Sequence, residues 1–201
     1  MHIPALAKVA HHAFIAATII SESQISSIAP TSSSCDNAPA KGQCATAKVA
    51  AEHITTAFQT YKITEKGEQA AVIALMALET QDFKYNKPID NTVPGKGTRN
   101  MQSPEYNKKY AQSIPSLSDK VTPVLNNPVD LLDVLRENAD ADFGSAAWFL
   151  TTQCTDTQRA GLASGSEAGW EDYILHCVQA PEVTKKRTEY WTEAKKVLGV
   201  E

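Results

Sequence analysis

The stretch TEKGEQAAVIALMALETQDFKYNKPIDNTVPGKGTRNMQ, residues 64–102, decides how the rest of the chain must fold. Nine apolar residues follow one another without a break from Ala70 to Leu78. A helix that is apolar all round must be buried, so we expect this segment at the centre of the domain, with Thr64 as its N-cap. The run ends at one carboxylate, Glu79, which is costly to bury unless it is paired or has a function.

The periodic pattern stops after Glu79. Residues 80–102 contain Pro88 and a Pro-Gly-Lys-Gly segment at 94–97. Proline and glycine at this density predict a loop, or a small hairpin that the Pro-Gly-Lys-Gly turn closes.

Helical spacing returns in the rest of the chain, where apolar residues recur every three or four positions. Asn127 followed by Pro128 is typical of a helix start, and Gly199 of a helix end. These patterns predict a mainly α protein with one domain and no internal linker. The further helices are expected at 44–61, from Pro104, from Pro128, and at 143–154, 166–178 and 184–199.

The four cysteines form two groups without a Cys-x-x-Cys pair, which makes a zinc site or a thioredoxin-type motif a weak interpretation. An even number in two local pairs favours two disulfides, Cys35–Cys44 and Cys154–Cys177. The alternative is a set of four reduced thiols in a cytosolic protein.

The N-terminal residues resemble a secretory signal. A weakly basic start is followed by a short apolar run, Ala13 to Ile20, and then by small polar residues. We therefore expect a signal peptide at 1–23, an extended lead-in at 24–42 and one folded domain at 43–201. The mature protein is expected to be secreted and monomeric, with no membrane segment.

Composition and charge narrow the classes of function. The net charge of −4 argues against a nucleic-acid partner, because phosphate binding needs a basic face. Beyond the leader only His53 and His176 remain, neither with a Gly-x-Ser-x-Gly partner, which argues against a serine hydrolase. No cluster of ligand-type residues points to a metal, and no cofactor is expected.

Glu79 has two interpretations. It is either an exposed carboxylate or one paired with Lys84 or Arg99, or it is a general acid. Partial burial at the exit of an apolar helix would favour a protonated carboxyl that can donate to a leaving oxygen. Glycoside cleavage is the reaction that most needs such a group.

A resemblance favours the second interpretation. Ala77-Leu78-Glu79-Thr80 and the later segment Gly97–Gln102 resemble the two motifs of lytic transglycosylases and goose-type lysozymes, glutamate-serine and glycine-leucine-methionine-glutamine. Residues 77–86, 94–111 and 143–154 resemble a group of secreted fungal muramidases with a lysozyme-like α domain. The likeness extends over roughly residues 44–198. The second motif departs from the family pattern, because Thr98-Arg99-Asn100 precedes Met101 here.

The resemblance implies a lysozyme-like domain with a buried central helix and a small β or loop segment beside an active-site cleft. It also implies hydrolysis of the β-1,4 bond between N-acetylmuramic acid and N-acetylglucosamine in bacterial peptidoglycan. Glu79 would protonate the leaving oxygen. The second catalytic group stays open between Asp82, Asp90 and the sugar's own groups. The expected substrate-binding residues are Thr80, Tyr85, Thr98, Asn100, Gln102 and Tyr106.

Other functions stay open on the same scaffold. One is a lytic transglycosylase or a chitinase, and the other is a non-catalytic secreted protein that binds cell walls.

Overall fold

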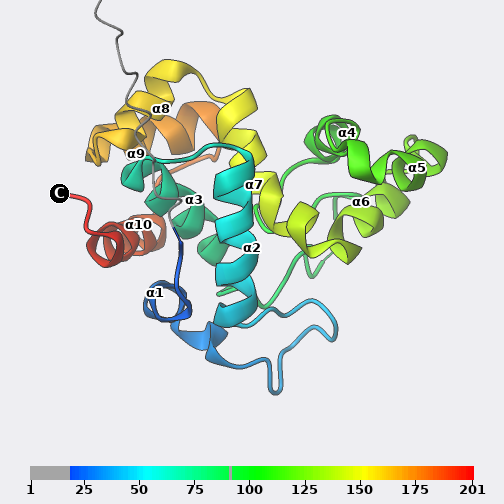
Figure 1. The fold of residues 1–201 in the computed structure, drawn as a ribbon, viewed down its shortest axis with the longest axis horizontal. Helices are drawn as coiled ribbons and strands as arrows, with labels where there is room; N and C mark the ends of the chain where they lie inside the picture. Colours follow the sequence, from blue (N-terminus) through cyan, green and yellow to red (C-terminus); the bar gives the residue numbers. More distant parts are fainter. Residues whose placement is uncertain (1–18, 91) are drawn as a thin grey trace, which may run out of the picture.

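The computed structural model describes residues 19–90 and 92–201, and most of the predicted secretory signal lies outside them. The described chain is mainly helical, which confirms the coarse prediction of a mainly α protein (Figure 1). Its α-helices are α1 (Glu22–Ile28), α2 (Ala47–Thr60), α3 (Lys66–Glu79), α4 (Pro104–Gln112), α5 (Ser118–Val121), α6 (Pro128–Glu137), α7 (Ala139–Gln153), α8 (Asp156–Ala163), α9 (Glu167–Asp172) and α10 (Lys185–Leu198). Short 3₁₀ turns stand at Pro30–Ser33, Pro115–Leu117 and Thr122–Val124, and a π-helix at Tyr173–Cys177 follows α9.

Helix α3 is the buried centre that its sequence predicts. Every residue from Gly67 to Ala77 is buried, and α1, α7, α8 and α10 pack around the helix. The approach of α8 requires glycine at position 67, because a Cβ there would lie 2.0 Å from the carbonyl oxygen of Leu162. The predicted Thr64 cap is wrong: Glu65 is the N-cap residue, and its side chain makes no capping hydrogen bond.

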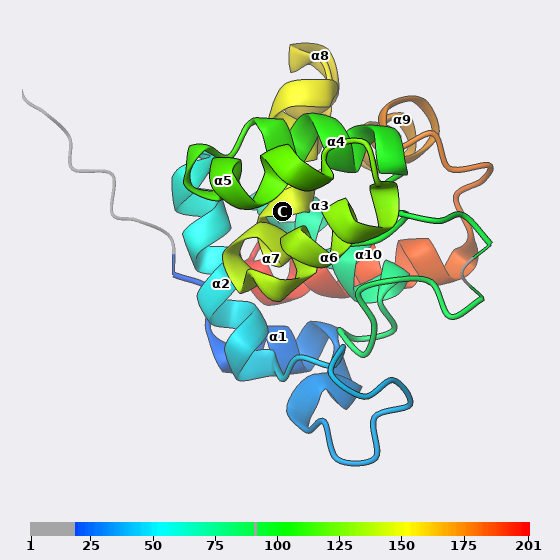
Figure 2. The same ribbon diagram turned by 90° about the vertical axis from the view of Figure 1, so that its right-hand side faces the viewer.

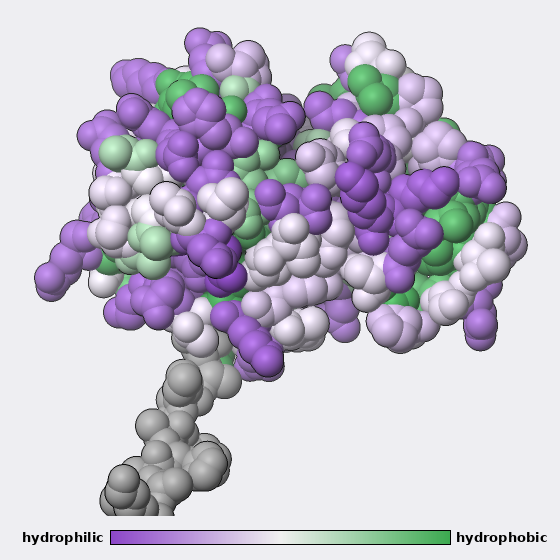
Figure 3. Space-filling model, turned by 90° about the horizontal axis from the view of Figure 1, so that it is seen from above, coloured by the Kyte–Doolittle hydropathy of each residue, from purple (hydrophilic) through white to green (hydrophobic). Residues whose placement is uncertain are grey.

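Helix α7 joins two groups of helices. It packs against α2 and α3 on one side and against α4 and α6 on the other. In Figure 1, α8, α9 and α10 lie to the left of α2, and α4, α5 and α6 lie together to the right. Figure 2 shows the group of α4, α5 and α6 from its outer side. The space-filling view in Figure 3 shows a notch between the two halves of the molecule.

The N-terminal segment belongs to the core, which corrects the expected extended lead-in at 24–42 and the domain start at 43. Helix α1 begins at a capping box on Ser21 and buries Ile25 and Ile28. It packs against α2 and α10. Ile20, three residues before the expected end of the signal peptide, is also buried. The folded unit therefore includes residues from about position 20 onward.

Two disulfides close short loops at opposite ends of the chain. They join Cys35 to Cys44 and Cys154 to Cys177, the pairs that the spacing predicts. The second ties the end of α7 to the π-helix.

The described residues 80–90 and 92–102 form a loop that contains an isolated antiparallel bridge between Gly97 and Gln102. The expected hairpin across residues 94–97 is wrong, because the turn that closes this bridge lies at 98–101. Thr98 and Met101 adopt positive φ values of 63° and 51° in this turn.

A buried ion pair fixes the loop to α7. The Arg99 Nε donates to Asp142 at 2.8 Å, and the Arg99 Nη1 donates to the carbonyl oxygens of Phe83 and Tyr85. The side-chain amide of Asn86 donates to the same Asp142 oxygen at 2.9 Å. The parts of the loop around Asn86 and around Arg99 are therefore both bonded to the Asp142 carboxylate.

Substitution Asp142→Asn should destabilise the fold by about 3–5 kcal/mol, because it leaves the buried Arg99 charge without a counterion. Equilibrium unfolding in urea measures this change. Asp133→Asn is the control: it breaks a pair with Arg136 in which the aspartate is 47% exposed, so its cost should stay below about 1 kcal/mol. Equal midpoints for the two variants would contradict a structural role for the Arg99–Asp142 pair.

Candidate functional site

The chain leaves α3 through an uncommon backbone turn. Gln81, Asp82 and Phe83 have φ values of 49°, 57° and 63°, all in the left-handed region. Such conformations cost energy for residues other than glycine, and they concentrate at functional sites. The Thr80 hydroxyl supports the turn, donating to the Met76 carbonyl and accepting from the Phe83 N–H. The turn separates Glu79 from Asp82, so Asp82 does not continue the helical face as one more helical turn would require.

Glu79 is neutralised by a residue far along the chain. Its carboxylate lies 2.8 Å from the Nη2 of Arg187 in α10, and both side chains are largely shielded, at 23% and 15% exposure. The predicted partners Lys84 and Arg99 bind elsewhere: Lys84 donates to the Thr31 and Ser34 carbonyls, and Arg99 pairs with Asp142. The Glu79 carboxylate is therefore held against the Arg187 guanidinium of α10.

Tyr173 in the π-helix lies behind this ion pair and is fully buried. Burial raises the pKa of its phenol, the nearby Glu79 adds to this effect, and Arg187 opposes it. Its hydroxyl has no hydrogen-bond partner within the described residues. Tyr173 is therefore a neutral phenol close to the Glu79–Arg187 pair.

Asp82 connects three parts of the chain through its hydrogen bonds. The side chain is buried, and its Oδ2 accepts from the Thr31 N–H at 3.0 Å and from the Thr31 hydroxyl at 2.8 Å. Its Oδ1 accepts from the Tyr190 hydroxyl at 2.5 Å. Both oxygens are therefore engaged, one by the N-terminal segment and the other by α10. Asp90, the alternative second carboxylate, is exposed in the loop and accepts from Thr92.

Three of the expected substrate-binding residues are bonded to one another, and the other three lie in separate places. Thr98, Asn100 and Gln102 form a buried chain of hydrogen bonds that continues to Asn107 and Ser145. Thr80 supports the turn after α3, and Tyr106 packs edge-on against Phe149 at 4.9 Å between ring centres. Among these residues Tyr85 alone lines the hollow beside Glu79.

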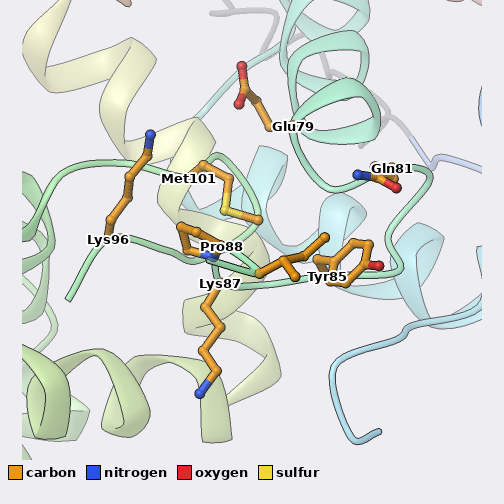
Figure 4. Close-up of a pocket in the computed structure, with 8 residues that line it drawn as sticks. Glu79, Gln81, Tyr85, Lys87, Pro88, Lys96 and Met101 are labelled. Carbon is orange, nitrogen blue, oxygen red and sulfur yellow. The ribbon is translucent and has the colours of Figure 1, made fainter. Parts of the chain in front are cut away.

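The structure has a hollow of about 200 Å³ at the end of α3, which we call the Glu79 hollow. Figure 4 shows Glu79 across the hollow from Tyr85 and Pro88, with its carboxylate turned away from them. Lys96 extends upward in this view, and Lys87 extends downward, away from Glu79. Its lining residues are Glu79, Gln81, Tyr85, Lys87, Pro88, Ile89, Lys96 and Met101.

The lining combines apolar surface with positive charge. Ile89 is 71% exposed, and Pro88 and Met101 add further apolar atoms. Within the described residues, neither Lys87 nor Lys96 has a carboxylate within ion-pair distance. Sequence reasoning missed both lysines and Arg187. The lysines lie in the loop already singled out, so their charge was a usable signal, whereas nothing local links Arg187 to Glu79.

The two described histidines lie apart from this hollow and are both engaged. The Nδ1 of His53 lies 2.6 Å from Asp140, and that of His176 lies 2.8 Å from Asp172. Within the part of the chain that the structure describes, no three His, Cys, Asp or Glu side chains come together in a way that could hold a metal ion.

The sequence comparisons give one partial relative and no family. No family model matches the chain. A bifunctional dioxygenase (DOX)-epoxy alcohol synthase (EAS) of Fusarium oxysporum (strain Fo5176) is 38% identical over 158 residues, which cover 75% of this chain. The same match covers 12% of that protein, so the chain corresponds to a small segment of a much larger one.

This comparison contradicts the predicted muramidase activity. The relative's name gives it oxygenase and synthase functions and no glycoside hydrolase. The predicted glycoside-hydrolase class loses its support with it, and so do the alternatives of a transglycosylase, a chitinase and a non-catalytic wall-binding protein. The geometry agrees, because Glu79 is paired with Arg187 and both oxygens of Asp82 are engaged.

The remaining expectations about partners stay predictions, namely a monomer that binds no nucleic acid. The described helices include none that is both long and apolar enough to cross a membrane.

Substitution Tyr190→Phe should lower stability by about 1–3 kcal/mol, because it removes the donor to the buried Asp82 oxygen. Burial and the hydrogen bond to Asp82 both raise the pKa of Tyr190, so the phenol stays a donor at neutral pH. Urea unfolding measures the loss. Tyr106→Phe is the matched control, because the Tyr106 hydroxyl makes no hydrogen bond to any described residue. An unchanged Tyr190→Phe midpoint would show that the tie to α10 is dispensable.

Proposed function

We propose that this domain binds a small amphipathic anion in the Glu79 hollow. One observation carries the proposal: two lysines lie beside an exposed apolar wall in this hollow. Neither lysine has a carboxylate partner among the described residues. Ligand sites typically combine such an apolar wall with a few placed polar groups. An anionic head would contact Lys87 or Lys96, and the apolar part would cover Ile89, Pro88 and Met101.

The charge balance of the hollow favours an anion. The lining contains one carboxylate, Glu79, and its charge is offset by Arg187 at 2.8 Å. The two lysines are therefore left as the uncompensated charges. An apolar wall beside them lowers the local dielectric, which strengthens attraction to a negative ligand.

The match to the partial relative is compatible with a binding role, because it covers only 12% of that protein. Oxygen chemistry is carried by metals or organic cofactors. Within the described residues no three His, Cys, Asp or Glu side chains come together as metal ligands, and neither His53 nor His176 lines the Glu79 hollow. We therefore infer that the segment shared with the dioxygenase-epoxy alcohol synthase is an accessory ligand-binding domain.

We also infer that the helices have a lysozyme-like arrangement. The support is a fully buried central helix that ends at a hollow beside a loop with an isolated β-bridge. Fold does not imply function, so this arrangement is compatible with a binding domain. Export of the chain is a further inference, supported by its two disulfides, which persist in oxidising compartments.

The binding test uses benzoate and its neutral counterpart benzamide, with 8-anilinonaphthalene-1-sulfonate as a fluorescent reporter. We expect benzoate to displace the reporter more strongly than benzamide, because charge and apolar surface act together. Lys96→Ala should weaken benzoate binding about fivefold, the equivalent of roughly 1 kcal/mol for a solvent-accessible ion pair. Added salt should reduce the preference for benzoate.

The matched control is Lys185→Ala, because Lys185 lies on α10 with its side chain 91% exposed and away from the hollow's lining. It should leave both affinities unchanged. Equal affinity for benzoate and benzamide in the wild-type protein would rule out the anion site.

A further inference from the structure

A second hollow, of about 450 Å³, adjoins the first. One of its sides is formed by Pro39, Ala40 and Gln43, which belong to the loop that the Cys35–Cys44 disulfide closes. Its other side is formed by Tyr85, Lys87, Pro88 and Ile89, all of which also line the Glu79 hollow. The segment 85–89 is therefore a wall that the two hollows share.

Gln43 connects the disulfide loop to this wall. Its side-chain oxygen accepts from the backbone N–H groups of Asn86 and Lys87 at 3.1 and 3.3 Å. Backbone contact continues next to it, because the Ala45 N–H donates to the Phe83 carbonyl at 2.9 Å. Gln43 is itself held within one residue of the disulfide at Cys44, which restricts where its amide can lie.

We propose that Gln43 is a positioning residue for the wall that the two hollows share. By accepting from two consecutive N–H groups, it holds Lys87 and the apolar residues Pro88 and Ile89 in place. The disulfide loop thereby shapes the Glu79 hollow without touching a ligand there.

For ligands larger than the first hollow, the second hollow accepts the part that extends past Ile89. This part of the inference rests on the proposed anion binding.

The chemistry of the second hollow fits the apolar end of such a ligand. Pro39, Ala40, Pro88 and Ile89 supply apolar surface, and Lys87 is its charged residue. An anionic head near Lys96 and an apolar end beside Ala40 would place the ligand along the shared wall, where the 71% exposed Ile89 would be covered.

The positioning role is tested without any ligand. Hydrogen exchange, read by NMR on the full chain, should become roughly 2- to 12-fold faster at the Asn86 and Lys87 amides in Gln43→Ala, the change that loss of an ordinary hydrogen bond gives. Gln43→Glu keeps the acceptor oxygen and should restore slow exchange. Lys41→Ala, an exposed change in the same loop, should have no effect. Amides of α3 serve as the reference for global stability.

Unchanged exchange at both amides in Gln43→Ala would overturn the positioning role. An equal acceleration in α3 would overturn it too, because the variant would then act on the whole fold.

The size preference is tested with Ala40→Trp, which fills the second hollow. The two-part aromatic probe 8-anilinonaphthalene-1-sulfonate should bind at least about tenfold more weakly, whereas the one-ring benzoate should keep its affinity. An unchanged affinity for the larger probe, with benzoate still bound, would overturn the second hollow as a binding region. If benzoate fails to bind the wild-type protein, the proposed function falls and the size preference falls with it, while the exchange experiment still decides the role of Gln43.

Discussion

The buried contact between Arg99 and Asp142 is the constraint on which the site depends. Burial raises the pKa of Asp142 and lowers the pKa of Arg99, because taking each charge out of water costs more than their attraction returns. The pair is therefore a poor source of net stability, and we infer that its role is to fix the path of the loop. One guanidinium holds the carbonyls of Phe83 and Tyr85 and one carboxylate of α7, so the loop has a single path past the end of α3.

Helix α10 completes the site from the other side. It supplies Arg187 to Glu79 and Tyr190 to Asp82, so one amphipathic helix neutralises one carboxylate and engages another at the exit of α3. What remains unneutralised is positive, namely Lys87 and Lys96 beside apolar surface. The positive charge of the hollow thus depends mainly on which charged side chains are already paired within the fold. The number of charged residues in the loop matters less.

The sequence predicts the helices well and the site poorly. The apolar run from Ala70 to Leu78 and the Asn127 cap specify their helices locally, and both helices are present. The turn at Gln81–Phe83 was missed because none of these residues is glycine, and tertiary contacts impose its left-handed backbone. Arg187 was missed because its pairing with Glu79 is nonlocal. The muramidase prediction depended on short motifs whose polar residues, Thr98, Asn100 and Gln102, are bonded to one another inside the loop.

The two residues that donate to Asp82, Thr31 and Tyr190, also bear on the order of folding. Its contact with Thr31 spans 51 positions of the chain, and its contact with Tyr190 spans 108. Contacts over such separations form late, because closing the long loop between the residues costs conformational entropy before the contact can stabilise the fold. During synthesis the turn after α3 therefore leaves the ribosome long before its second partner exists. Until α10 emerges and docks, the apolar helix α3 lacks one of the helices that cover it, and exposed apolar surface of this kind favours aggregation.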